Sequence, residues 1–155
     1  PPGRSLRAHE EGPDRVPAEV VVRTLGVPGY RTRCERHRAN GRAGIFAAVV
    51  GDPYCTADSG DALRAAEMQC DALLKGTSVD GIYDSDPKTN PDAKRYDTVD
   101  YGTVLAKNLK VMDASAVALC RDNAIPIIVF SIREKGNLAR VLAGQGTQTT
   151  VQKGA

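Results

Sequence analysis

From residue 44 onward the chain alternates short apolar runs with stretches of helical periodicity. Residues 45–50 form a continuous apolar run that ends at Gly51-Asp52-Pro53, which predicts a buried strand followed by a loop. After Asp58, which suits an N-cap, apolar residues recur three and four positions apart and predict a helix. The expected inner face of that helix and its continuation holds Leu63, Ala66, Cys70 and Leu73, with Arg64 and Glu67 on the outer face.

Beyond this helix the pattern predicts three more strands, three more helices and a long polar loop. The strands are expected at residues 72–74, 126–130 and 147–151, and the helices at 100–108, 114–123 and 136–143. The first of these strands should stop at Lys75-Gly76-Thr77, and the loop should span residues 78–97. Because strands and helices alternate, and the run 126–130 is apolar throughout, we expect a three-layer α/β domain with a mainly parallel sheet.

Residues 1–43 differ in composition from the rest of the chain. They carry nine basic residues, all Arg, five acidic residues and five of the nine prolines. Such a mixture buries too little apolar surface to offset the entropy of ordering, so we expect a poorly ordered or aberrant segment here and a folded part over residues 44–155. The Arg excess raises nucleic-acid binding as an alternative, which no aromatic interleaving or known motif supports. His9 and His37 lie in this segment and receive no role.

Composition excludes several other classes of protein. No apolar run approaches the roughly 18 residues that a membrane-spanning helix needs. The four cysteines lie far apart without a C-x-x-C pair, so we expect reduced thiols in a cytoplasmic protein rather than disulfides or a zinc site. Cys55 has no histidine near it in sequence, and we expect it to fill space rather than act as a nucleophile.

Polar residues follow three of the predicted strands, at residues 51–58, 75–86 and 131–135. The carboxyl ends of strands in such sheets collect ligands. Lys75 with the amides of Gly76 and Thr77 suits phosphate oxygens, and Tyr83 offers a ring face to a purine. Acidic side chains of the same stretch suit ribose hydroxyls or water around Mg²⁺; they are Asp80, Asp84 and Asp86. The alternative is a solvated turn, because Asp-Gly and Asp-Pro are turn formers and no Walker A or dinucleotide spacing is present.

Three blocks of sequence resemble a known family in order and spacing. They are residues 65–96, residues 110–123 with Lys-Val-Met-Asp-Ala-Ser-Ala, and residues 125–131 with Ile-Pro-Ile-Ile-Val-Phe-Ser. Together they resemble bacterial UMP kinase (uridylate kinase) of the amino-acid kinase superfamily, over about residues 44–151 and the carboxyl-terminal half of a usual member. The resemblance implies a partial amino-acid kinase (carbamate kinase-like) fold, with residues 44–155 as its carboxyl-terminal nucleotide-binding part.

The same resemblance implies an activity and its partners. The expected reaction is transfer of the ATP γ-phosphoryl group to UMP with Mg²⁺, giving UDP and ADP, in pyrimidine nucleotide synthesis. The family works in the cytoplasm as hexamers with GTP and UTP as effectors, so a homo-oligomer is expected, without a membrane or nucleic acid as partner.

The resemblance also implies roles for particular residues. Asp58, Asp113 and Lys75 form the catalytic group; Asp58 would organise the basic groups around the transferring phosphate, and Asp113 would act in catalysis or stability. The ATP contacts fall on Thr77, Tyr83 and Asp86, and no protein-held metal is expected. The UMP loop falls on Val50, Gly51, Asp52, Pro53, Tyr54, Cys55, Thr56 and Ala57. Capping for the two acids, and a surface charge for Lys75, remain as alternatives.

Departures from the family pattern concern the UMP loop and the amino-terminal segment. Asp52 stands where the family has a neutral Asn, and Val50 and Ala57 replace Thr. The family's K-x-S-G-E phosphate loop is not found in residues 1–43, where only residues 30–42 echo a family helix. We therefore expect a fragment with an incomplete site, and the alternative is a non-catalytic remnant that retains ATP binding or an assembly surface.

Overall fold

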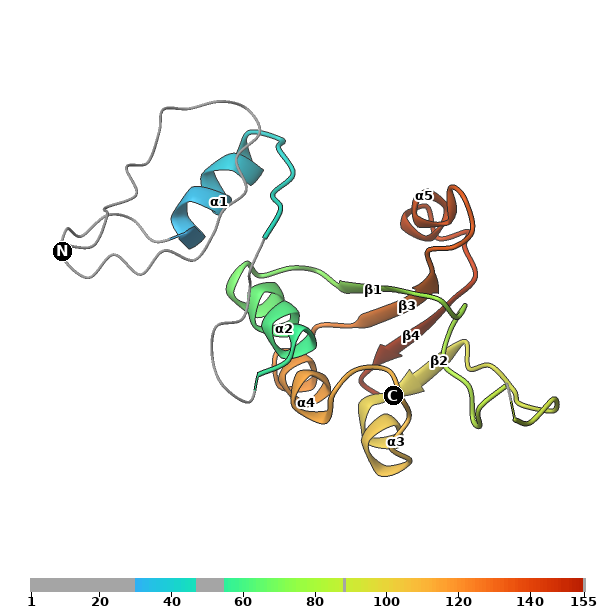
Figure 1. Cartoon of the computed structure of the whole chain (residues 1–155). Coiled ribbons are helices and arrows are strands. Elements are labelled where there is room, and N and C mark those ends of the chain that lie inside the picture. Colours follow the sequence, from blue (N-terminus) through green and yellow to red (C-terminus); the bar gives the residue numbers. More distant parts are fainter. Residues whose placement is uncertain (1–29, 47–54, 88, 155) are drawn as a thin grey trace, which may run out of the picture. The chain divides into compact units, whose positions relative to one another are not determined.

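The computed structural model describes residues 30–46, 55–87 and 89–154 (Figure 1). The chain divides into two compact units, residues 1–49 and 50–155, each of which is described by itself. In the first unit the described residues include helix α1 (Tyr30–Ala39), which carries an Arg31–Glu35 ion pair of 2.8 Å one turn apart. This helix coincides with the echoed family helix at residues 30–42. Residues 1–29 and 47–54, with most of the expected strand at 45–50, lie outside the described residues.

The second unit contains a four-stranded sheet in the order β1-β3-β4-β2. Its strands are β1 (Leu73–Thr77), β2 (Thr98–Asp100), β3 (Ile127–Ser131) and β4 (Gln148–Gln152). The β1–β3 and β2–β4 pairs are parallel, while β3 and β4 are antiparallel. The carboxyl ends of β1 and β3 therefore share one edge with the amino end of β4, and β2 ends at the opposite edge.

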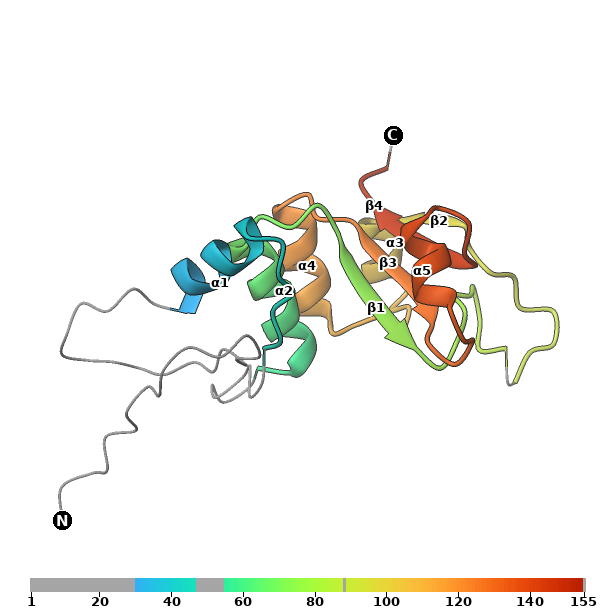
Figure 2. The ribbon, with the colours of Figure 1, turned by 90° about the horizontal axis from the view of Figure 1, so that it is seen from above.

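Helices cover both faces of this sheet, as Figure 1 shows. Helices α2 (Ala57–Glu67), α3 (Tyr101–Ala106) and α4 (Ala114–Asp122) lie on one face, and α5 (Asn137–Leu142) lies on the other. Figure 2 shows α2 and α4 side by side. The expected three-layer α/β domain with a mainly parallel sheet is confirmed.

The core lies between the sheet and helices α2 to α4. Ile127 and Val151 are fully buried in the sheet, and Ala62 of α2 and Ala116 of α4 are fully buried on the helices. Small side chains at these positions let the two helices approach closely. The expected inner face was right for Leu73, which is buried, and for Ala66 and Cys70, which pack against the core, but wrong for Leu63. Leu63 is 42% exposed, and the buried residues of this helix and its cap are Ala62, Ala65 and Met68. On α4, Ala116, Val117 and Cys120 face the core as expected.

Most predicted elements match within one or two residues, and two differ. Strand β1 continues through Lys75-Gly76-Thr77 instead of stopping there, because these residues pair in register with Val129, Phe130 and Ser131. Strand β2 was not predicted at all. Its three residues pair with β4 at the end of the long loop, and only Val99 is buried.

The predicted loop at residues 78–97 has a narrow base. Backbone hydrogen bonds join Asp84 N to the Lys94 carbonyl at 3.0 Å and Tyr96 N to the Ile82 carbonyl at 2.8 Å. We call these paired segments, residues 82–84 and 94–96, the loop neck. Among the residues that the structure describes, no helix has the length and apolar character needed to cross a membrane.

Candidate functional site

The amino termini of α2 and α4 meet beside the carboxyl ends of β1 and β3. Each helix runs antiparallel to the strand that follows it, so its first turn returns to the edge where that strand ends. Thr56 caps α2 in extended conformation, with its hydroxyl accepting from Ser59 N at 3.3 Å. The expectation that Asp58 is the cap was therefore wrong. Asp58 lies in the first turn, where its negative charge interacts favourably with the positive end of the helix dipole.

Asp113 joins the two helices through its carboxylate. It caps α4 by accepting from Ala116 N at 2.7 Å, and the Ser115 hydroxyl donates to it at 2.6 Å. From α2, the Ser59 hydroxyl donates to Asp113 at 3.1 Å, and the hydroxyl of Thr56 donates to it as well. We call these four residues, Thr56, Ser59, Asp113 and Ser115, the cap cluster.

The hydroxyls of the cap cluster and the Ala116 N–H stabilise the charged form of Asp113. Burial by itself would raise the pKa of this carboxyl, but the hydroxyls of Ser115 and Thr56, Ala116 N–H and the Ser59 hydroxyl together lower the pKa to about 2. Asp113 is thus an anion at neutral pH whose oxygens already hold several donors. The expectation that Asp113 suits a helix cap is confirmed.

Lys75 reaches from β1 to the first turn of α2. Its ammonium forms an ion pair with Asp58, and both side chains are partly buried, at 29% and 22% exposure. Lys75 is therefore held in place rather than free on the surface. The pKa of Asp61, one turn further along α2, is raised above its ordinary value. Partial burial is the main cause, the charge of Lys75 acts against it, and the charge of Asp58 adds to it. The three predicted catalytic residues, Asp58, Lys75 and Asp113, thus lie around the start of α2.

The predicted ATP residues lie on β1 and on the loop that follows it. Thr77 ends β1, and its carbonyl accepts from Ile132 N at 2.9 Å. Tyr83 is half-buried in the loop neck and donates its hydroxyl to Asp80 at 2.8 Å, a hydrogen bond that, with burial, raises the pKa of Tyr83. Asp86 is exposed, and its carbonyl accepts from Thr89 N and Asn90 N to close a turn.

Only the end of the predicted UMP loop is described. Residues 50–54 (Val50, Gly51, Asp52, Pro53 and Tyr54) lie outside the described residues, so the predicted effect of Asp52 stays a prediction. Thr56 and Ala57 begin α2. Cys55 is exposed, so the expectation that it fills space in the packing was wrong. All four thiols are free where they are described, and burial raises the pKa of Cys120 to about 11.

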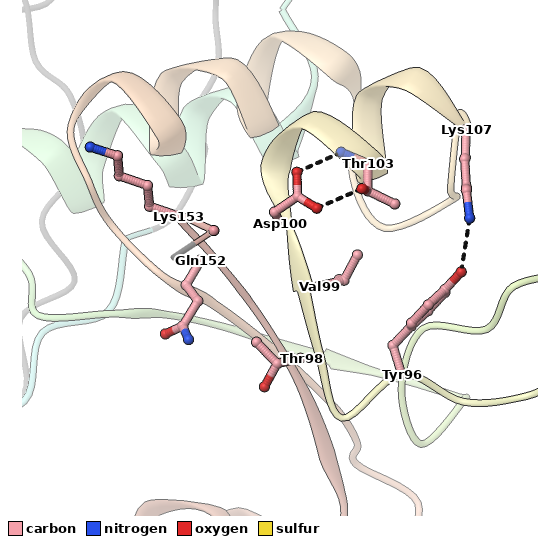
Figure 3. Close-up of a pocket in the computed structure, with 9 residues that line it drawn as sticks. Tyr96, Thr98, Val99, Asp100, Thr103, Lys107, Gln152 and Lys153 are labelled. Atoms are coloured by element: carbon pink, nitrogen blue, oxygen red, sulfur yellow. Dashed lines mark hydrogen bonds between the residues drawn. The ribbon is translucent and has the colours of Figure 1, made fainter.

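A separate pocket of about 520 Å³ lies at the opposite edge of the sheet (Figure 3). Asp100, at the end of β2, lines it together with Lys107, whose ammonium donates to the Tyr96 hydroxyl at 3.3 Å. Asp100 caps α3 by accepting a hydrogen bond from Thr103 N. The hydroxyl and the N–H of Thr103 lower the pKa of the Asp100 carboxyl. None of the nine residues that line this pocket was predicted as a site residue.

Within the part of the chain that the structure describes, the donor set provides no resident metal site. Among the described residues no group of three or more His, Cys, Asp or Glu side chains is close enough to hold an ion. A divalent cation that accompanies a nucleotide would instead find its oxygen ligands on the phosphates.

Sequence reasoning missed Ser59 and Ser115 as members of the site. Each is a serine in the first turn of its helix, a position where hydroxyls commonly bond locally. Their hydroxyls lie 2.9 Å apart and bridge the two helices. The pattern Asp-Ala-Ser at residues 113–115 gives a weak local signal for capping, but nothing in it indicates the contact with α2.

Comparison with known proteins places the chain in a family. The family model described as "Amino acid kinase family" matches residues 39–131. A uridylate kinase of Erythrobacter litoralis is 75% identical over 138 residues, which cover 89% of this chain and 58% of that protein. A uridylate kinase of Zymomonas mobilis is 61% identical over 137 residues, which cover 88% of this chain and 57% of that protein. The crystal structure of UMP kinase from Bacillus anthracis superposes with a TM-score of 0.82 at 36% identity, covering 91% of this chain and 58% of that one.

The chain belongs to the amino acid kinase family. Within that family, the relatives that it resembles are uridylate kinases, and it spans somewhat more than half of their length. An aspartate kinase from Synechocystis, at 22% identity and a TM-score of 0.60, shares the fold. The expected resemblance and fold class are therefore confirmed.

Proposed function

We propose that this chain is the carboxyl-terminal, nucleotide-binding part of a UMP kinase, in which the complete site transfers the γ-phosphoryl group of ATP to UMP. The observation that carries the proposal is the arrangement at the start of α2. There Thr56, near the end of the predicted UMP loop, donates a hydrogen bond to Asp113, and Asp58 in the first turn of α2 pairs with Lys75. High identity to uridylate kinases over 89% of the chain supports it.

The proposed chemistry needs alignment and charge neutralisation more than proton transfer. The acceptor is already a phosphate, so no strong general base is required. Lys75 supplies a compact positive charge from the middle of β1, and Asp58 holds that charge in place. Asp113 acts through Thr56 and Ser59, whose hydroxyls it orients at the end of the UMP loop. In this arrangement Asp113 positions the loop rather than touching the reacting phosphate.

ATP is proposed to bind over the loop that follows β1. The bond from the Tyr83 hydroxyl to Asp80 fixes the ring in the loop neck, where its face suits a purine. Thr77 at the strand end and Asp86 beyond Tyr83 complete the proposed set. Mg²⁺ accompanies the ATP phosphates, and a cytoplasmic homo-oligomer with GTP or UTP as effectors belongs to the same proposal.

Binding of Mg-ATP to the purified chain tests this assignment. Calorimetry should give a dissociation constant near millimolar, because the chain spans only 58% of its uridylate kinase relative. This constant corresponds to a binding free energy of about 4 kcal/mol. Tyr83→Ala should abolish the measurable heat. Tyr83→Phe keeps the ring but loses the hydrogen bond to Asp80 that fixes it, so it should bind more weakly than the parent and still measurably. A folded chain that gives no heat at high ATP would overturn the ATP site.

A second candidate is a chain that binds ATP without phosphorylating UMP. It is favoured by the fact that the chain spans only 58% of its uridylate kinase relative. Both candidates predict ATP binding, so turnover separates them.

A further inference from the structure

Thr149 of β4 lies under the loop neck and contacts both of its segments. The residue is fully buried. Its hydroxyl accepts from Ile82 N at 2.9 Å and donates to the Tyr96 carbonyl at 2.5 Å. A hydroxyl has one proton to donate and lone pairs to accept, so a single Thr149 side chain satisfies one backbone group on each side of the neck.

Two neighbours of Thr149 on β4 hold the same region by other contacts. The Gln148 carbonyl accepts from the Arg95 guanidinium at 2.5 Å, and Thr150 N donates to the Asp97 carbonyl at 2.9 Å. Three successive residues of β4 therefore secure the base of the loop. Of these three contacts, that of Thr149 is the one made by a side chain of β4, so it is the one that a substitution on β4 can remove.

Gly81 shows how closely the loop approaches Thr149. A Cβ atom at this position would lie 2.4 Å from the Thr149 hydroxyl oxygen and 2.9 Å from Cδ of Arg95. A side chain on residue 81 would push the loop away from β4. Gly81 and Thr149 are thus in close contact. In sequence, Gly81 immediately precedes Ile82 and lies two positions before Tyr83.

We propose that Thr149 is a positioning residue for the nucleotide loop: its hydroxyl fixes Ile82 and thereby the ring of Tyr83 against which ATP binds. The inference rests on the proposed function, in which Tyr83 meets the purine. Thr149 touches no ligand itself. Replacing its hydroxyl leaves the Ile82 N–H and the Tyr96 carbonyl without their buried partner, which costs more than an ordinary exposed bond.

The test compares three variants of the full 155-residue chain. Thr149→Val keeps the shape and removes the hydroxyl, Thr149→Ser keeps the hydroxyl, and Thr150→Val is the matched control on the next residue of β4. Amide hydrogen exchange of Ile82, measured without ATP, reports on the contact itself. Thr149→Val should accelerate this exchange at least about tenfold, with Thr149→Ser and Thr150→Val within about threefold of the parent.

Mg-ATP affinity reports on the consequence of the contact. Thr149→Val should weaken binding at least about fivefold while Thr149→Ser restores it. Gly81→Ala, which displaces the loop without altering β4, should produce the same two changes and serves if Thr149→Val fails to fold. Unchanged Ile82 exchange in both Thr149→Val and Gly81→Ala overturns the inference, as does accelerated exchange with unchanged ATP affinity. A parent chain that binds no ATP overturns the proposed function, and with it the nucleotide role of Thr149, while the exchange data still decide whether Thr149 holds the loop.

Discussion

At the scale of single residues, Asp113 stabilises two helices with one carboxylate. It caps α4 and accepts hydroxyls from Thr56 and Ser59 at the start of α2. Asp113→Ala should lower the free energy of unfolding by about 2 kcal/mol at pH 7, since losing a cap costs about 1 kcal/mol and the hydroxyls left without an acceptor add a similar amount. Asp113→Asn should lower the free energy of unfolding by less than Asp113→Ala does, because Asn is also a good N-cap residue. Urea unfolding measures both, with Asp122→Asn at the exposed end of α4 as the matched control.

The pH dependence of this stabilisation follows from the lowered pKa of Asp113. The folded-state pKa is about 2, below the ordinary value of 3.8. Stability that depends on the charged form is therefore complete above about pH 4 and is lost as the pH falls toward 2. The difference in unfolding free energy between the parent and Asp113→Asn should narrow over that range. A difference that stays constant from pH 5 to pH 2 would contradict a role for the charge.

Sequence reasoning at this scale predicted that Asp113 caps α4, but it missed the hydrogen bonds that Asp113 receives from the start of α2. Asp113 is a plausible cap because it precedes a helical pattern, and that feature is visible within a few residues. The bonds from Thr56 and Ser59 cross 57 and 54 positions of sequence. They exist only because α2 and α4 pack side by side, which local patterns do not specify. The same holds for Thr149, which is 67 positions from Ile82.

At the scale of elements, the connection between α5 and β4 depends on Gly146. A Cβ atom there would lie 2.5 Å from Cγ2, 2.8 Å from the backbone nitrogen and 3.0 Å from the Cα of Val141. Because two of these atoms belong to the backbone, α5 must move to admit an alanine. Gly146→Ala should lower the unfolding free energy by about 1–3 kcal/mol, the usual range for overpacking. Gly154→Ala, whose Cβ would be 3.5 Å from Asp100 Cβ, is the control and should change little in the same denaturation experiment.

The elements themselves were largely predictable, and the errors have physical reasons. The apolar runs and the helical periodicity located α4, α5, β3 and β4 within one or two residues. Leu63 was wrongly included in the inner face of α2 because leucine gives a strong hydrophobic signal, whereas the smaller Ala62 and Ala65 are the residues buried there. Glycine suggested the end of β1, but pairing with β3 overrides that local preference.

At the scale of the whole molecule, the predicted catalytic residues and the predicted ATP residues lie at one edge of the sheet. The start of α2, the ends of β1 and β3 and the loop neck beside β4 all belong to that edge, as the parallel β1–β3 pair and the antiparallel β3–β4 pair require. The sequence could predict this convergence from the order of strands and helices. It could not predict that Lys75 is already paired with Asp58, because their contact depends on how α2 packs on β1.

UMP phosphorylation by this chain alone should be very slow. The described residues bring one lysine to the site, and its charge is shared with Asp58. The sequence contains no K-x-S-G-E motif, which in the resembled family forms a phosphate loop. Two polyanions must come within bonding distance, and electrostatic stabilisation is usually the largest catalytic contribution. Each missing contact of about 3 kcal/mol slows the reaction by about a hundredfold.

A coupled assay of ADP release with UMP and ATP measures this turnover. It is run on the chain alone and with the amino-terminal part of a related uridylate kinase supplied in trans. Activity should arise only in the mixture, because only there are cations placed on both sides of the transferring group. Asp58→Asn should then abolish the recovered activity, since Lys75 loses the partner that holds it, whereas Asp122→Asn should leave it intact. Rapid UDP formation by the isolated chain would show that these residues suffice for catalysis and would contradict the incomplete site.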